Sequence, residues 1–307
     1  MKHVTLKQLR AFAAVVRTAS VTGAARALHV SPPAITLQMR LLQEQLGVPL
    51  IERSAAGMTP TMAGRLLADT VKRVEIVLND SAAAIAALAG VETGTVQVGV
   101  VSTAKYFAPR VLGAFSQAHP GIDLRLVVGN RAEIIAGLRD HELDLAVMGR
   151  PPEDLEVVST VIGDHPHVVV APPSHRLAGG QAMSPVSLAG ETFLVRERGS
   201  GTRMLMEQFF EQSGIAPRFG MEIGSNETVK QAVMAGLGIA FLSAHTIELE
   251  VQTGRLAVLD VAGLPIVRQW CVVRLAERRS MPAVDLLGSY LSEEGRLFLP
   301  RYTRPAA

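Results

Sequence analysis

The sequence predicts an α/β protein preceded by an all-α N-terminal module and a long connecting helix. Two short helices joined by a tight turn are indicated between residues 19 and 47. A helical pattern of apolar residues then continues from residue 61 to about residue 88. From residue 95 onward, strand-like and helix-like segments alternate, which is typical of a parallel sheet with helices on its faces.

Length and composition agree with two or three compact units. The chain has 307 residues, of which 48% are hydrophobic, and no apolar run approaches the roughly 18 residues of a membrane span. The N-terminal segment has neither an uninterrupted apolar core nor a small-residue cleavage site, so we do not interpret it as a signal peptide. The one cysteine, Cys271, excludes an internal disulfide and is expected in a buried strand. We therefore expect a cytoplasmic protein.

Charge is distributed unevenly along the chain. Residues 1–65 contain eight basic and two acidic side chains, a net charge of +6, whereas the whole chain carries +2 and the remainder therefore −4. A basic N-terminal module on a mildly acidic body is typical of a nucleic-acid-binding protein with a separate second function.

Residues 5–18 are expected to form a first helix, followed by the helix-turn-helix. Ser20 or Thr22 can cap the next helix, and Ser31 is expected to cap the one after it. Pro32 takes the first position of that helix, where a missing N–H costs nothing. Helical spacing directs four of its residues inward: Ile35, Met39, Leu42 and Leu46.

The outward face of this last helix has the chemistry of a surface that reads a major groove. Thr36 and Arg40 can hydrogen-bond to base edges, and Leu37 can contact a thymine methyl group. An ordinary helical hairpin in an enzyme is the alternative. The pair Ala24-Ala25 at this spacing before a tight turn favours the DNA-binding interpretation.

A wing is expected beside the helix-turn-helix. Residues 48–53 resemble a short extended segment and residues 54–58 a turn, which places Arg53 to contact phosphate or enter a minor groove. The predicted DNA-binding residues are Ser31, Pro33, Thr36, Leu37, Arg40 and Arg53.

A long helix is expected from its cap, Thr61, to about Leu88. Steps of four and three residues define a heptad seam of Leu67, Val71, Val74, Leu78, Ser81, Ile85 and Leu88. Because one helix cannot bury such a seam alone, we expect it to pair with the same helix of a second subunit. Two recognition helices could then read the two halves of a near-palindrome. Gly90 and Gly94 bracket a predicted hinge.

The body is expected to form two α/β lobes joined by crossing strands, with a cleft between them. Predicted strands lie at 96–101, 124–128, 143–148, 156–161, 167–171, 192–195, 219–223, 239–242 and 269–273. Predicted helices lie at 105–118, 133–139, 202–213, 226–235 and 282–291. The expected domains are 1–60, 61–89 and 90–307, with lobe I at about 94–162 and 268–300 and lobe II at about 163–267.

Three polar stretches follow predicted strands and begin predicted helices: 102–105, 199–203 and 225–228. Free N–H groups at helix starts, with nearby arginines and lysines, suit a phosphorylated or carboxylated ligand. The alternative is that each Ser or Thr only caps a helix and each Arg is a solvated surface charge.

Catalysis and metal binding have little support. The chain lacks the nucleophile-elbow, zinc-protease and P-loop motifs. His165 and His167 have no accompanying Cys or carboxylate cluster, so we expect them at the start of a strand rather than in a metal site. A serine of these stretches, Ser102 or Ser200, could form a hydrolase pair with one of these histidines, but the spacing does not favour it. No catalytic cofactor is expected.

The sequence resembles the LysR-type transcriptional regulators across nearly its whole length. The match is carried by AARALHVSPPAITLQMRLLQEQLGVPLIER at 24–53 and TPTMAG at 59–64. The resemblance implies a winged helix-turn-helix, a dimer formed through the linker helix and a two-lobed, periplasmic-binding-protein-like (type II) effector domain. It also implies, in most members, a tetramer.

Blocks in the body resemble the CbbR branch, which controls the Calvin-cycle carbon-fixation operon of autotrophic bacteria. They are VSTAKYFAPR (101–110), VGNR (128–131), DLAVMGRPP (144–152), RERGSGTR (196–203) and SNETVKQAVMAGLGIAFLSAHT (225–246). The resemblance implies anionic effectors such as ribulose 1,5-bisphosphate, phosphoglycerate, phosphoenolpyruvate or NADPH. It places the inter-lobe effector site on Ser102, Thr103, Asn130, Gly201, Thr202 and Asn226, to which charge and position add Lys105, Arg150 and Arg196.

The DNA end departs from the family pattern at two positions. Many members have glutamine where this chain has Pro32, and often arginine where it has Leu37. More of the recognition is therefore expected from Thr36, Arg40 and DNA shape.

The sequence thus predicts a metabolite-responsive transcription factor rather than an enzyme. Expected partners are double-stranded promoter DNA, a small anionic metabolite and further copies of the chain in a homodimer or homotetramer, with RNA polymerase as a further candidate and no membrane. Three alternatives stay open: a LysR-type regulator of another pathway with a carboxylate effector, an enzyme with a DNA-binding appendage, and a solute-binding protein.

Overall fold

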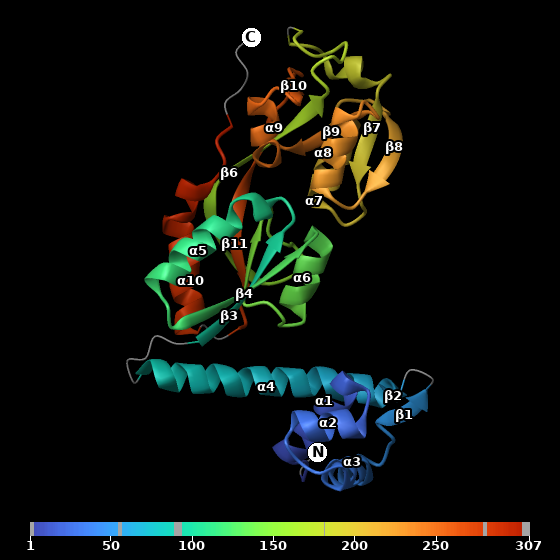
Figure 1. Ribbon diagram of the computed structural model, residues 1–307, viewed down its shortest axis with the longest axis vertical. Helices are drawn as coiled ribbons and strands as arrows, with labels where there is room; N and C mark the ends of the chain where they lie inside the picture. The colour runs from blue at the N-terminus through green and yellow to red at the C-terminus, as the bar shows by residue number, and fades with distance from the viewer. Residues whose placement is uncertain (1–2, 55–56, 89–93, 181, 279–280, 303–307) are drawn as a thin grey trace. The chain divides into compact units, whose positions relative to one another are not determined.

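The computed structural model describes residues 3–54, 57–88, 94–180, 182–278 and 281–302. It divides into two compact units, Met1–Ala82 and Ala83–Ala307, which are considered separately below. Figure 1 shows both units and labels many of their helices and strands.

The N-terminal unit begins with the three expected helices, α1 (Leu6–Thr18), α2 (Val21–Ala27) and α3 (Pro32–Leu46). Ser20 caps α2, because its Oγ accepts a hydrogen bond from the Gly23 N–H at 3.2 Å. Ser31 occupies the N-cap position of α3 as expected, but its side chain accepts no capping hydrogen bond. Gly47 ends α3 with φ +70°, a left-handed conformation that glycine adopts without strain.

The three helices share one apolar core. Phe12 of α1, Ala24 and Ala25 of α2, and Ile35 and Leu42 of α3 are almost fully buried together. Met39 joins them, whereas Leu46 is only half-buried. The predicted inward face of α3 is therefore confirmed.

The predicted wing is a two-stranded antiparallel hairpin, β1 (Ile51–Ser54) and β2 (Gly57–Pro60). The turn is narrower than the 54–58 predicted, because Ser54 and Gly57 already pair with each other within the hairpin. Residues 55–56 lie outside the described residues. Arg53 pairs with Met58 and is exposed.

The linker helix α4 runs from Met62 to Leu88, and Thr61 caps it by accepting a hydrogen bond from the Gly64 N–H at 3.0 Å. The prediction that Leu67 and Val71 contact a second subunit is wrong. Both side chains are buried in the helix-turn-helix core of their own chain. Leu78 and Ile85 are 41% and 68% exposed and stay available. The side chain of Leu88 and the hinge residue Gly90 are outside the described residues.

The second unit contains a sheet that runs through both lobes in the order β4-β3-β5-β11-β6-β9-β7-β8. In lobe I, β3 (Gly94–Val101), β4 (Ile122–Gly129) and β5 (Leu145–Met148) are parallel. Helices α5 (Ala108–Ala118), α6 (Arg131–Arg139) and α10 (Pro282–Glu293) contribute to the lobe I core. The predicted βαβαβ unit is thus confirmed.

Two long strands join the lobes: β6 (Val157–Ala171) and β11 (Ile266–Leu275), which pair antiparallel with each other (Figure 1). The prediction of separate strands at 156–161 and 167–171 is wrong, because β6 continues through Pro166. Proline has no N–H to donate to a neighbouring strand. Pairing of β6 with β9 begins only at His167, so Pro166 is not required to donate a hydrogen bond to β9.

Lobe II contains the parallel strands β7 (Thr192–Arg196), β8 (Arg218–Ile223) and β9 (Ile239–Ser243). Its apolar side chains alternate between two faces of the sheet. Phe193 and Phe241 pack in the cluster that includes residues of α7 (Gly201–Gln212), whereas Leu194 and Leu242 pack with α8 (Asn226–Met234).

Several short elements were not predicted. They are α9 (Glu248–Gln252), β10 (Ala257–Leu259) and the 3₁₀ turns η1 (Ala104–Tyr106), η2 (Pro185–Leu188), η3 (Ala244–Thr246) and η4 (Gly295–Phe298). The helix predicted at 105–118 is divided into η1 and α5, with Pro109 in the first turn of α5. Among the described residues, no helix combines the length and apolar content that crossing a membrane requires.

Replacing Gly64 by alanine is expected to destabilise the N-terminal unit by more than about 2 kcal/mol. A Cβ at this position would overlap the Leu50 carbonyl oxygen, a backbone atom that Thr61 N–H already holds at 3.0 Å. Gly113→Ala is the matched control, because Gly113 lies in helix α5 with no atom within 4 Å of the added Cβ. Calorimetric unfolding should show a lower transition for Gly64→Ala and an unchanged or slightly higher one for Gly113→Ala; equal transitions would contradict the packing described.

Candidate functional site

The first candidate surface is the outward face of α3. The side chains of Pro33, Thr36, Leu37 and Arg40 are exposed on it, as predicted, with Ser31 exposed just before the helix. Leu37 is 43% exposed, an apolar side chain left uncovered beside polar ones. Arg53 is exposed on the wing rather than on this helix.

These side chains have few competing partners. Thr36 donates a hydrogen bond to the Pro32 carbonyl at 3.1 Å, and Arg40 lies 3.6 Å from Glu44 in an exposed ion pair. Exposed ion pairs contribute little free energy, so the Arg40 guanidinium can exchange Glu44 for another acceptor. The face therefore offers a hydroxyl, a guanidinium and an apolar group of the sizes that fit a major groove.

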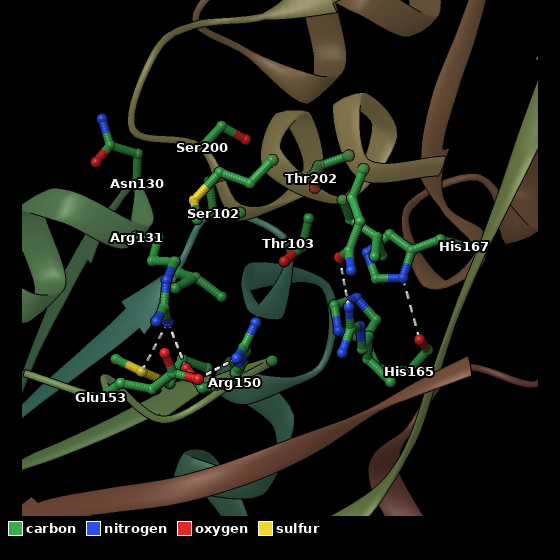
Figure 2. A pocket seen from close by; sticks show the side chains of 18 of the residues that line it. Ser102, Thr103, Asn130, Arg131, Arg150, Glu153, His165, His167, Ser200 and Thr202 are labelled. Carbon is green, nitrogen blue, oxygen red and sulfur yellow. Dashed lines mark hydrogen bonds and ion pairs between the residues drawn. The ribbon is translucent and has the colours of Figure 1, made fainter. Parts of the chain in front are cut away.

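The second candidate site is a cavity of about 670 Å³ between the lobes of the second unit. Six residues predicted for the effector site line it: Ser102, Thr103, Asn130, Arg150, Gly201 and Thr202. Figure 2 shows Ser200 and Thr202 above Thr103, with Arg131 and Arg150 on the left and the two histidines on the right. The ends of β3 and β5 and the starts of α6 and α7 bring these residues together.

Arg196 does not line the cavity but lies behind it, 3% exposed. Its guanidinium donates to Ser102 Oγ of lobe I at 3.2 Å and to Asn226 Oδ1 of lobe II, and it is ion-paired with Glu197. Arg196 therefore connects the lobes and holds Ser102, which does line the cavity. Direct contact of Arg196 or Asn226 with an effector stays an untested prediction.

Lys105 also lies outside the cavity lining, in a cluster that joins η1 of lobe I to α8 of lobe II. Its Nζ is 3.9 Å from Glu227, whose carboxylate also accepts a hydrogen bond from the Tyr106 hydroxyl. The buried Lys230 lies 3.0 Å from Glu227 and 2.9 Å from Glu250, with its Nζ above the Tyr106 ring. Burial, and next the hydrogen bond to Glu227, raise the pKa of Tyr106. This cluster gives Lys105 a structural role in holding the lobes, and its direct contact with an effector likewise stays an untested prediction.

Two cavity arginines were not among the predicted site residues. Arg131 donates hydrogen bonds to the Arg150 and Pro151 carbonyls, and Arg268 donates to Gln208 Oε1 at 3.0 Å. Burial, and next the neighbouring Arg150 charge, lower the pKa of Arg131. Among the described residues, neither Arg131 nor Arg268 forms an ion pair with a carboxylate, whereas Arg150 pairs with Glu153. Arg131 is among the basic residues that the sequence places near a predicted helix start, but it was not assigned to the site; Arg268 carries no local sequence pattern.

The start of α7 adds a polar wall. Ser200 is its N-cap residue, but the side chain makes no capping hydrogen bond, and Ser200, Gly201 and Thr202 all face the cavity. Free N–H groups and the helix dipole favour an anion here. The Asn130 side chain, by contrast, is already used: its Oδ1 accepts a hydrogen bond from the Glu133 N–H at 3.0 Å in a capping box.

His165 and His167 line the cavity from within β6, so the prediction that they start a strand is wrong. Burial lowers the pKa of His165 well below its usual range and that of His167 to about 3, so both rings are neutral at pH 7. In the part of the chain that the structure describes, no group of three or more His, Cys, Asp or Glu side chains is placed to hold a metal ion.

Comparison with known proteins places both units in described families. The bacterial regulatory helix-turn-helix protein family of lysR type matches residues 6–65, and the LysR substrate binding domain matches residues 89–296. The HTH-type transcriptional regulator CbbR of Xanthobacter flavus is 51% identical over 97% of this chain and 90% of its own length. A RuBisCO operon transcriptional regulator of Allochromatium vinosum is 45% identical over 96% of this chain and 98% of its own.

Among solved structures, the regulatory domain of Synechocystis PCC6803 CcmR in complex with 2-PG superposes with a TM-score of 0.63. It is 38% identical and covers 65% of this chain and 96% of its own. The family match extends over both units and the full-length relatives align nearly end to end. The chain belongs to the LysR family of bacterial helix-turn-helix transcriptional regulators.

Proposed function

We propose that this regulator controls transcription of a RuBisCO (carbon-fixation) operon and that its effector is a small phosphorylated anion bound between the lobes. One observation carries the proposal: Arg131 and Arg268 face the cavity with no carboxylate ion pair among the described residues, beside the start of α7. Cationic groups of this kind bind phosphate and carboxylate strongly. The names of the regulators from X. flavus and A. vinosum, and the 2-PG complex of CcmR, support the operon and the ligand class.

We further propose that residues 1–60 bind promoter DNA, that 61–89 link subunits and that 90–307 sense the effector. The exposed Leu78 and Ile85 of α4 support pairing with a second copy of the chain, and two such dimers would form the tetramer. The dimer would present two α3 helices to two half-sites of a promoter. Promoter binding of this kind would take place in the cytoplasm.

Effector binding would act by changing the closure of the two lobes. The lobes contact each other through replaceable polar bonds, such as Arg196 with Ser102 and the Ala132 N–H with the Gly199 carbonyl at 3.3 Å. A ligand that contacts both lobes shifts this equilibrium by the difference in its affinity for the two arrangements. Linked DNA-binding dimers would then change the bend of the promoter.

Removing either unpaired cavity charge is expected to weaken effector binding. Arg131→Gln and Arg268→Gln should each raise the Kd of 2-phosphoglycolate or ribulose 1,5-bisphosphate about 10- to 100-fold, because each loses a charged hydrogen bond. The test is titration calorimetry on the full chain, with phosphoglycerate, phosphoenolpyruvate, NADPH and unphosphorylated carboxylates in the same panel. Arg125→Gln is the control, since Arg125 is exposed on β4 beside Asp123. Preferential binding of an unphosphorylated carboxylate would contradict the proposed carbon-fixation role. The protein would then be a regulator of another pathway.

On DNA, the helix face and the wing are expected to act differently. Arg40→Ala should reduce discrimination between a selected site and random DNA by about 1–3 kcal/mol, because it removes a base contact. Arg53→Ala should weaken binding to both DNAs alike and lower the slope of log K against log salt by about 1, because it removes a phosphate contact.

Fluorescence anisotropy at several salt concentrations measures both effects, using a DNA site selected from a random pool by the wild-type chain. A uniform loss from Arg40→Ala would assign this side chain to the phosphate backbone instead of a base.

A further inference from the structure

His165 lines the cavity, and only one of its two ring nitrogens has a hydrogen-bond partner among the described residues. The side chain is 3% exposed, and its Nε2 lies 2.9 Å from Ser243 Oγ. Within the described residues, three buried side-chain atoms have no hydrogen-bond partner: His165 Nδ1, Asn226 Nδ2 and Glu250 Oε2. Of these three residues, His165 is the one that lines the cavity. A buried polar atom without a partner is costly, which makes Nδ1 a natural contact for a ligand.

The His165 ring is held in one orientation. Trp270 stacks on it with ring centroids 3.7 Å apart and an angle of 16° between the planes, and His167 contacts it at 4.2 Å. By contrast, His167 Nδ1 is already within 3.1 Å of the His165 carbonyl oxygen. The direction of His165 Nδ1 is therefore fixed by packing before any ligand arrives.

Gly149 lies directly against this nitrogen. A Cβ at Gly149 would lie 2.8 Å from His165 Nδ1, and Gly149 itself lines the cavity. Any side chain at this position would thus overlap Nδ1. Nδ1 itself is buried, so an effector oxygen that bonds to it must displace the Gly149 backbone, which carries no side chain to oppose that shift.

Charge favours donation from this nitrogen to an anion. Burial, and next the neighbouring His167 and His245, keep the His165 ring neutral, so one nitrogen carries a proton. Ser243 Oγ can either donate to or accept from Nε2, and its donation to Nε2 puts the proton on Nδ1, the tautomer that an anion at Nδ1 favours. Arg268 is the cross-strand neighbour of His165 on β11 and supplies a positive charge to the same part of the cavity.

We propose that the Nδ1–H of His165 donates a hydrogen bond to an anionic oxygen of the effector, with Arg268 beside it and Ser243 donating to Nε2. This inference rests on the proposed function. The proposed contact gives the cavity an anion-binding group on β6, one of the two strands that join the lobes. Arg131 and Arg150 lie on the opposite side in Figure 2. The fitting ligand class is a small metabolite with anionic groups at two separated positions.

Two substitutions of His165 separate its nitrogens. The amide nitrogen of His165→Asn occupies about the place of Nδ1, whereas that of His165→Gln occupies about the place of Nε2. With 2-phosphoglycolate as the probe and the full chain in the calorimeter, His165→Asn should bind within about threefold of wild type. His165→Gln should bind at least about tenfold more weakly, because it loses one hydrogen bond to an anion.

The reverse order, or equal affinities, would overturn the inference, because His165 would then act through Ser243 or not at all. Unfolding temperatures without ligand report whether each variant folds. If either does not, Gly149→Ala provides the test with His165 unchanged: it should lose at least about tenfold in affinity, whereas the control Gly113→Ala, in α5 and outside the cavity, should bind like wild type. Wild-type affinity of Gly149→Ala would overturn the inference.

The two proposals fail in different ways. If wild type binds 2-phosphoglycolate and the Asn and Gln variants do not differ, the contact at His165 is wrong and the proposed effector class stands. If wild type binds none of the phosphorylated compounds, the proposed effector class is wrong and the contact at His165 is withdrawn with it.

Discussion

The antiparallel ladder between β6 and β11 is the interaction on which the second unit depends. It runs from Val157 opposite Leu275 to His167 opposite Ile266 and makes one sheet of the two lobes. Trp270 on this ladder is fully buried, packs edge-on against Phe107 of lobe I and donates a hydrogen bond to His245 Nδ1 of η3 at 3.0 Å. Because the cavity lies against these strands, every residue that lines it from either lobe is positioned relative to the same ladder.

Away from the ladder, the named contacts between the lobes are polar. Arg196 holds Ser102, Tyr106 holds Glu227, and the Ala132 N–H bonds to the Gly199 carbonyl. A hydrogen bond between neutral groups contributes about 0.5–1.5 kcal/mol net and one to a charged group about 1.5–3 kcal/mol, which is comparable to what one ligand contact contributes. A ligand can therefore alter the closure of the lobes without breaking either lobe's apolar core. The covalent and hydrogen-bonded continuity of β6 and β11 keeps the lobes attached while this happens.

Local sequence pattern predicted the helices and most strands, because their periodicity and caps are local properties. The spacing of Ile35, Met39 and Leu42 predicted the buried face of α3, and Thr61 predicted the start of α4. Pairing between strands distant in the chain was harder to predict from sequence. The single strand β6 was predicted as two strands on either side of residues 162–166, because the sequence does not show that β9 begins to pair only at His167. Arg268 and His165 were missed as cavity residues for the same reason, since they meet across strands distant in sequence.

The unequal pairing of the cavity arginines bears on what the cavity binds. Arg150 already has Glu153, so an anion that approaches it must compete with an ion pair. Arg131 and Arg268 have carbonyl and amide oxygens as hydrogen-bond acceptors, and the carboxylates of Asp154 and Glu153 act on Arg131 only at longer range. A half-buried arginine without a direct ion pair is only partly compensated by such charges, and an anion that contacted it in the cavity would supply the missing partner. The proposed selectivity for anions therefore rests on which arginines the fold leaves without an ion-paired carboxylate, and not on the number of arginines in the wall.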